Sequence, residues 1–213
     1  MDLISLIYTA NENNEIKSTT NIFASTASPI LKNLSDGRPV LICTNEQDEL
    51  IIALFDIQSN SWDFNTYGFL SGIFNLSVDV FDQTIIIGCK STNADYGVYL
   101  YDVPTNNLTD ITPFSGTYNS TVEGTIKVTC GGLNPLKVAL AYEFSDGAIG
   151  SVEYNSGNGD WEPLAENSSS IFPNNTAVIY GSSYGIKTVS NTNTIYIVSN
   201  FNGGAGNSLR VFS

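Results

Sequence analysis

Two tryptophans and the carboxylates beside them are the residues of this chain whose types and spacing best fit ligand recognition. Trp62 precedes Asp63, and Trp161 lies between Asp160 and Glu162, with turns rich in amide side chains beside both. An aromatic ring offers an apolar face to the C–H groups of a sugar, while carboxylates and amides hydrogen-bond its hydroxyl groups. These five residues predict a carbohydrate site. The shared register of the two tryptophans also fits a repeated packing anchor.

Carboxylates are the only candidates for catalysis. Histidine is absent, which excludes Ser-His-Asp and Cys-His catalysis and His-ligated zinc. Two carboxyl groups about 5 to 9 Å apart could hydrolyse a glycoside, and one stretch holds five: Glu143, Asp146, Glu153, Asp160 and Glu162. Nothing in their spacing fixes such a pair, so we expect no catalytic residues. The acidic residues also lack the dense alternation of a calcium loop, so no metal and no cofactor are expected.

The charge of the chain bears on its partners. The 213 residues carry 8 basic and 21 acidic side chains, a net charge of -13, and no cluster of lysine or arginine. Binding to nucleic acid is therefore not expected. No apolar run approaches the roughly 18 residues of a membrane-spanning helix, and no basic segment precedes the apolar start, so we expect neither a membrane span nor a signal peptide.

The three cysteines are far apart in the sequence. Each ends a short apolar run, and the spacings of 46 and 41 residues between them do not fit a CxxC redox or zinc motif: Cys43, Cys89 and Cys130. An odd number also argues against a complete set of disulfides. We expect all three to be buried on strands.

A unit of about 46 to 58 residues recurs along the chain. An aromatic residue closes an alternating strand at intervals of 47, 46, 53 and 58 residues: Tyr8, Phe55, Tyr101, Tyr154 and Phe212. A polar turn follows the first four, and a large apolar residue lies seven positions beyond the middle three: Trp62, Leu108 and Trp161. Each unit therefore contains a hairpin. The clearest copy runs from Leu136 to Leu164.

Two further strands are expected upstream of each hairpin, such as PVLICT before Phe55 and TIIIGC before Tyr101. Four strands in a period of this length are typical of a propeller blade. The sequence thus predicts an all-β, β-propeller-like array of four to five four-stranded antiparallel units, with almost no helix. The predicted units are 1–27 (partial), 28–72, 73–117, 118–168 and 169–213, forming one domain. The alternative is a β-sandwich or jelly roll, which also has many short alternating strands.

The two ends of the chain are unmatched. It begins at the third strand of a unit, Leu3 to Tyr8, and ends at the third strand of another, Leu209 to Phe212. Pairing the ends would close a ring by strand exchange. Three arrangements are open: a four-bladed ring with a spare strand, five units with an incomplete fifth, or an arc completed by a neighbouring chain.

The stretch LKVALAYEFSDGAI followed by YNSGNGDW resembles blades of the fungal fucose-binding β-propeller lectins. Turns such as FDIQSNSW also resemble kelch blades. The lectin resemblance implies a pocket built from an arginine, a glutamate on the following strand and aromatic residues. In this chain Arg210 matches the arginine position, Lys137 is the nearest substitute in the quoted stretch, and Ser151 stands at the glutamate position there.

The leading interpretation is a non-catalytic, lectin-like binding protein whose candidate residues are Trp62, Asp63, Asp160, Trp161, Glu162 and Arg210. Its expected partner is a glycan or another protein chain, and the unmatched terminal strands would allow a homo-oligomer. The first alternative is a structural or adhesion component of a virion or surface appendage. The second is a carboxylate-based glycoside hydrolase. The compartment is not indicated.

Overall fold

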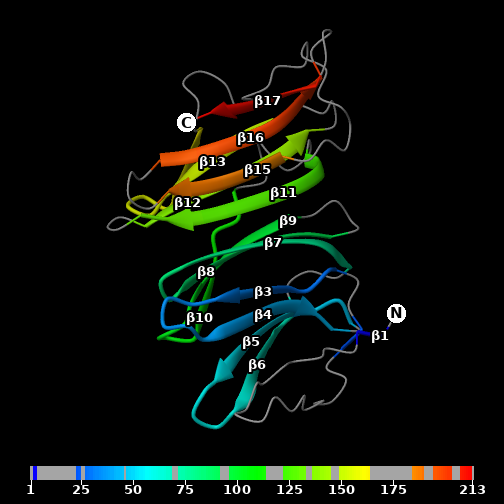
Figure 1. Cartoon of the computed structure of the whole chain (residues 1–213), viewed down its shortest axis with the longest axis vertical. Coiled ribbons are helices and arrows are strands. Elements are labelled where there is room, and N and C mark those ends of the chain that lie inside the picture. The colour runs from blue at the N-terminus through cyan, green and yellow to red at the C-terminus, as the bar shows by residue number, and fades with distance from the viewer. Residues whose placement is uncertain are drawn as a thin grey trace.

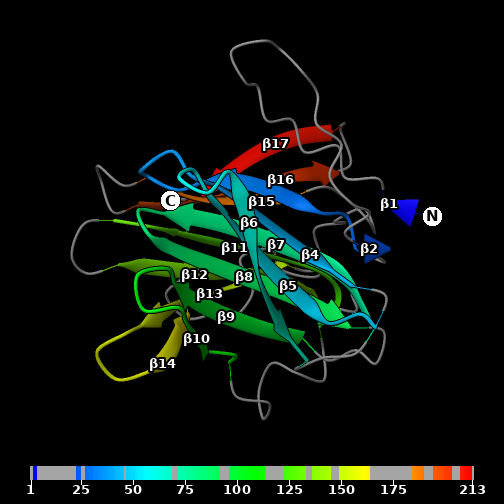
Figure 2. The same ribbon diagram turned by 90° about the horizontal axis from the view of Figure 1, so that it is seen from below.

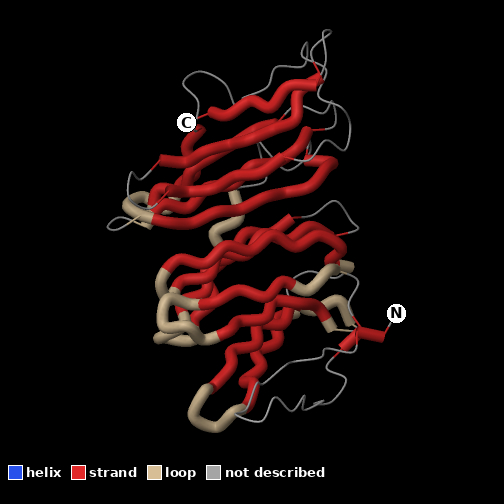
Figure 3. The backbone as a smooth tube through the Cα atoms, viewed as in Figure 1, coloured by secondary structure: helices blue, strands red, loops and turns tan. Residues whose placement is uncertain are grey.

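All regular structure in the described part of the chain is β-strand (Figure 3). The computed structural model describes residues 2–3, 23–24, 27–45, 47–68, 72–91, 96–113, 122–132, 136–144, 149–163, 184–189, 194–202 and 207–212. The predicted first anchor, Tyr8, lies outside these residues. The expectation of almost no helix is confirmed for the described residues.

The strands form antiparallel sheets whose members follow one another in the chain. The first sheet comprises β3 (Ile30–Asn33), β4 (Pro39–Thr44), β5 (Leu50–Asp56) and β6 (Ser61–Tyr67). The second comprises β7 (Ile73–Phe81), β8 (Thr84–Ser91), β9 (Tyr96–Asp102) and β10 (Asn107–Asp110). The third comprises β11 (Val122–Gly131), β12 (Lys137–Phe144), β13 (Ile149–Asn155) and β14 (Asp160–Pro163). The fourth has three described strands, β15 (Tyr184–Val189), β16 (Thr194–Asn202) and β17 (Asn207–Phe212), and a separate pair joins β1 (Asp2–Leu3) to β2 (Phe23–Ala24).

The four sheets stack face to face in chain order (Figure 1). The first strands of successive sheets, β3, β7, β11 and β15, lie against one another, whereas β6, β10 and β14 form the outer edges. Figure 2 looks along the stack, with the first sheet in front of the second and third. We call the three contacts between successive sheets the first, second and third junctions.

Apolar residues fill the first two junctions because neighbouring residues of a strand point to opposite faces. Ile85 lies in the core of the first junction, with Val40 and Ile42 of the first sheet. Ile86, the next residue, lies in the core of the second junction, with Leu140 of the third sheet. The second sheet therefore has buried residues on both of its faces.

A recurring turn explains why the third and fourth strands form hairpins. Asp56 and Asp102 each accept a hydrogen bond from the backbone N–H three residues on, at 3.3 and 3.2 Å. Asn60 and Asn106 then adopt a left-handed conformation with φ of 51°, and Gly159 has φ of 77° in the third sheet. Asparagine and glycine tolerate this conformation better than other residues, so these turns fix the hairpin register locally.

Polar side chains join the first strands of successive sheets. Asp79 of β7 accepts hydrogen bonds at Oδ2 from the Thr129 hydroxyl (2.7 Å) and the Cys130 N–H (3.2 Å) of β11. The Thr129 hydroxyl in turn accepts from the N–H of Thr188 in β15 at 2.9 Å. The Lys187 ammonium, also in β15, lies 2.7 Å from both carboxylate oxygens of Asp79. One carboxylate thus connects three sheets.

This arrangement confirms the predicted β-propeller-like array of antiparallel four-stranded units. The sheets do not close into a ring: the first and fourth sheets lie at opposite ends of the stack (Figure 1). The described strand β1 pairs with β2, not with the fourth sheet. The three cysteines are buried and free, as expected: Cys43 in β4, Cys89 in β8 and Cys130 in β11.

Candidate functional site

The two tryptophans occupy equivalent positions in the outer strands of the first and third sheets. Trp62 of β6 lies opposite Phe55, and Trp161 of β14 lies opposite Tyr154. The ring centroids are 5.3 and 5.4 Å apart, with interplanar angles of 61° and 54°. Both pairs therefore repeat one aromatic contact at one register.

Trp161 is part of the second junction. Its ring packs among the buried residues between the second and third sheets, and its indole N–H donates to the carbonyl of Ile111, just after β10, at 2.5 Å. Trp62 packs with Cys43, Ile51 and Ala53 on the face of the first sheet that points away from the second. Trp161 thus lies on the face that the third sheet turns toward the second. Trp62 lies on the equivalent face of the first sheet, which points away from the second.

The predicted carboxylates lie on the other faces of the same strands. Asp63 and Glu162 are direct neighbours of the tryptophans and so point to the opposite side, and Asp160 lies on the side of Glu162. All three are exposed. Arg210 lies in β17 opposite Ser199, and its side chain is outside the described residues. The structure therefore distributes the six predicted residues over three sheets and, in the third sheet, separates Trp161 from Glu162.

The third junction differs in chemistry from the first two. The residue preceding the aromatic anchor faces the following sheet, and it is Leu54 in the first sheet and Leu100 in the second, each packed against its junction core. The same position in the third sheet is Glu153, opposite Ala139. A carboxylate therefore stands where two junctions have a partly buried leucine.

Neighbouring positions on this face follow the same trend. Where the first sheet presents Val40, Ile42 and Ile52, and the second presents Ile86, Gly88 and Val98, the third presents Ala139, Ala141 and Ser151. The face adjoins β15 through β12. Ser151 is 1% exposed and its hydroxyl has no hydrogen-bond partner among the described residues. The third sheet thus turns small and polar side chains toward the fourth.

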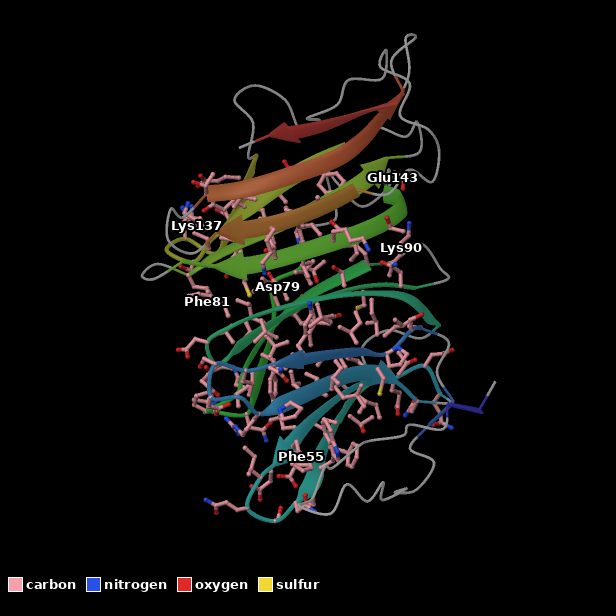
Figure 4. All side chains as sticks on the ribbon, viewed as in Figure 1. Phe55, Asp79, Phe81, Lys90, Lys137 and Glu143 are labelled. Carbon is pink, nitrogen blue, oxygen red and sulfur yellow. The ribbon has the colours of Figure 1, made fainter. Side chains whose placement is uncertain are left out.

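Two neighbouring pairs of polar side chains lie at the outer part of this face. Lys137 of β12 forms an ion pair with Glu153 of β13, and both side chains are partly exposed, at 28% and 27%. Glu162 lies opposite Glu153 in the strand register and accepts a hydrogen bond from the Asn155 amide at 3.1 Å. We call Lys137, Glu153, Asn155 and Glu162 the polar cluster. Lys137 lies at one end of β12, and the buried Glu143 lies near the other end (Figure 4).

The structure corrects two residue assignments that were drawn from the lectin resemblance. Lys137 lies in the second strand of its sheet but Arg210 lies in the third strand of its own, so the two positions are not equivalent. Ser151 is buried, and the carboxylate on the strand that follows Lys137 is Glu153, two residues on and on the same face. Comparing the residue before each anchor, Leu54, Leu100 and Glu153, would have identified this position from the sequence.

The described residues give little support to thiol chemistry or to metal binding. Burial raises the pKa of the Cys43 thiol to about 11 and that of Cys89 to about 12, which keeps both protonated near neutral pH. Within the described ranges no three His, Cys, Asp or Glu side chains gather as metal ligands would. In the same part of the chain, no helix has the length and apolar character needed to cross a membrane.

Antiparallel sheets stacked about their first strands define a β-propeller-like protein. Solved structures similar to it include AofleA from Arthrobotrys oligospora, a fungal fucose-specific β-propeller lectin, with a TM-score of 0.63 and 12% identity over 90% of this chain and 55% of that one. A variant of AofleA with three arginines replaced by alanine matches with a TM-score of 0.55 and 12% identity, over 87% and 53%.

The comparisons confirm the resemblance to this kind of lectin at the level of the fold. The chain spans about half the length of these solved structures. No protein-family model matches it, and no curated protein sequence does.

Proposed function

We propose that the chain is a non-catalytic, lectin-like protein that binds a carbohydrate at the third junction through the polar cluster. The observation that carries the proposal is Glu153, which stands where the other two junctions have a partly buried leucine packed against the junction core. A carboxylate there costs the apolar contact that stabilises the other junctions, and its pairing with Lys137 leaves both groups partly exposed. Such a departure from the repeat suits a site that binds a ligand.

The cluster has the groups that a sugar needs. The Lys137 ammonium donates, the Glu153 and Glu162 carboxylates accept, and the Asn155 amide does both. Adjacent hydroxyl groups of a pyranose commonly pair one donor with one acceptor, and the Lys137–Glu153 pair offers that combination on neighbouring strands.

The charge of the cluster favours a neutral sugar. One ammonium and two carboxylates give it a net charge of minus one, in a chain whose own net charge is -13. Sialic or uronic acids would meet like charge on approach. We therefore expect neutral saccharides, with fucosides among the first to test because of the shared fold.

A binding experiment tests the proposal with a substitution that places leucine at position 153. The wild-type protein is screened on a glycan array, and hits are measured by calorimetry with Glu153→Leu, which restores the residue of the other two sheets. We expect a folded variant with binding reduced at least about tenfold, the effect of losing one charged hydrogen bond. Asp63→Asn, an exposed carboxylate outside the cluster, is the matched control and should bind like wild type.

Four results would contradict parts of the proposal. If no glycan on the array binds, carbohydrate binding is contradicted. If Glu153→Leu binds like wild type, the assignment of the site to the polar cluster is contradicted. Loss of binding by Asp63→Asn alone would move the site to the first sheet. A panel of chromogenic glycosides should show no turnover, and hydrolysis abolished by a carboxylate-to-amide change would make the protein an enzyme.

A further inference from the structure

The third junction contains a buried hydroxyl group at a position that is apolar in the first two junctions. Strand pairing makes Ser151 of β13 equivalent to Ile52 of β5 and Val98 of β9. Ile52 and Val98 are buried in their junction cores. Ser151 is buried too, but its hydroxyl has no hydrogen-bond partner among the described residues. The third junction thus gives up an apolar contact here without gaining a hydrogen bond.

The fourth sheet brings a second such hydroxyl to the same junction. The N–H of Cys130 donates to the side chain of Asp79 in the preceding sheet. The N–H of Thr188 donates in the same way to the side chain of Thr129. Thr188 is therefore equivalent to Cys130, which lies in the core of the second junction, and its side chain faces the third. The Thr188 hydroxyl is buried and also has no hydrogen-bond partner among the described residues.

These groups favour separation of the third and fourth sheets over β13. A buried hydroxyl without a partner costs free energy, which contact with water or with a ligand hydroxyl recovers. Ala139 and Ala141 lie beside Ser151 on the face of the third sheet, and their small side chains offer little apolar contact. The inner strand of the fourth sheet is held by the ion pair of Lys187 with Asp79. The outer part of the junction, where the polar cluster lies, is therefore the part that can open.

We propose that the third junction opens at its outer part and that a neutral saccharide enters between the two sheets, with one sugar hydroxyl bound to Ser151 and another to Glu153. This inference rests on the proposed carbohydrate site and adds a residue that determines its specificity. The two side chains lie two residues apart on one face of β13, about 6 to 7 Å along the strand. The serine hydroxyl can donate and accept without adding charge, so it selects a sugar that presents a hydroxyl group to the interior of the junction.

Thiol labelling measures the opening without any sugar. Ser151→Cys places a thiol in the third junction with little change in size, and Val98→Cys places one at the equivalent position of the second junction. Wild type supplies the background, because its three cysteines are buried. With a thiol reagent at pH 8, position 151 should react more than about tenfold faster than position 98, since local openings differ widely in free energy within one protein. Equal rates would overturn the opening of the third junction.

A binding measurement tests the role of Ser151. The probe is fucose or, if fucose does not bind, the strongest neutral glycan of the array. Ser151→Ala should weaken its binding about fivefold to tenfold, while the urea midpoint should not fall, because the hydroxyl has no partner in the closed junction. Ser77→Ala is the matched control: the Ser77 hydroxyl is buried in the second junction and accepts from the Val128 N–H at 3.0 Å. This control should unfold at a lower urea concentration and bind like wild type.

The outcomes separate this inference from the proposed function. If Ser151→Ala binds like wild type while Glu153→Leu does not, the role of Ser151 is overturned and the site at the polar cluster stands. If Ser151→Ala lowers the urea midpoint as much as Ser77→Ala, its hydroxyl is hydrogen-bonded in the closed protein, which also overturns the inference. If no glycan binds to wild type, the entry of a sugar falls with the proposed function, and the labelling rates alone decide whether the junction opens.

Discussion

Replacing Asp79 should lower the free energy of unfolding by a large amount for a side chain of its size. Its carboxylate joins β7 to β11 through Thr129 and Cys130 and to β15 through Lys187. The side chain of Asp79 is 10% exposed, whereas that of Lys187 is 61% exposed. Replacement by alanine removes an acceptor from a buried place and leaves the Cys130 N–H without a partner.

The magnitude follows from those environments. Each hydrogen bond from a buried group to a charged acceptor contributes about 1.5 to 3 kcal/mol, so losing two of them in Asp79→Ala should cost about 3 to 6 kcal/mol. The ion pair adds less than about 1 kcal/mol, because water screens the largely exposed ammonium of Lys187. Asp79→Asn keeps an acceptor of the same size and should cost only about 1 to 2 kcal/mol. Domain stabilities are about 5 to 15 kcal/mol, so the alanine variant should be marginal.

Urea unfolding followed by tryptophan fluorescence measures these losses. The expected order of destabilisation is Asp79→Ala, then Asp79→Asn, then Lys187→Met, with Asp160→Ala as an exposed control within about 0.5 kcal/mol of wild type. Amide exchange should also speed up at Thr188, whose N–H depends on Thr129. If Asp79→Ala unfolds at the urea concentration of the control, the carboxylate does not hold the sheets together. A Lys187→Met loss as large as that of Asp79→Ala would assign the effect to charge instead of to the buried acceptors.

Two other predictions concern buried groups. Trp161→Phe should lose about 1 to 2 kcal/mol more in urea unfolding than Trp62→Phe, because the Trp161 N–H donates to the Ile111 carbonyl whereas the Trp62 N–H has no hydrogen-bond partner among the described residues. Equal losses would contradict this interpretation. The cysteines should not react with a thiol reagent at pH 8 until the protein unfolds, because burial protects them and raises their pKa values, to about 11 in Cys43. Rapid reaction of one thiol in the native protein would show that its strand opens.

The hairpin units could be predicted because their signals are local. Phe55 and Trp62 are seven residues apart, and so are Tyr154 and Trp161, and both pairs face one another across a short turn. Alternating apolar residues and turn residues specify such a hairpin without any information from distant segments. The burial of the cysteines follows from the same alternation, since each ends an apolar run on a strand.

The contacts between sheets could not be predicted in the same way. Asp79 and Lys187 are 108 residues apart, and no local pattern indicates that a lysine of the fourth sheet reaches a carboxylate of the second. The sequence also suggested that Trp161 and Glu162 act together because they are adjacent. Adjacent residues of a strand point to opposite faces, so one of them belongs to the second junction and the other faces the third.

The same alternation limits how many carbohydrate sites one chain can have. Glu153 has leucine at its equivalent positions in the first two sheets, Leu54 and Leu100, and each leucine is partly buried and packs against a junction core. At this position those junctions are closed by apolar contact and offer no carboxylate for a sugar hydroxyl. Within the described sheets the polar cluster is therefore a departure of one unit, not a property of the repeat.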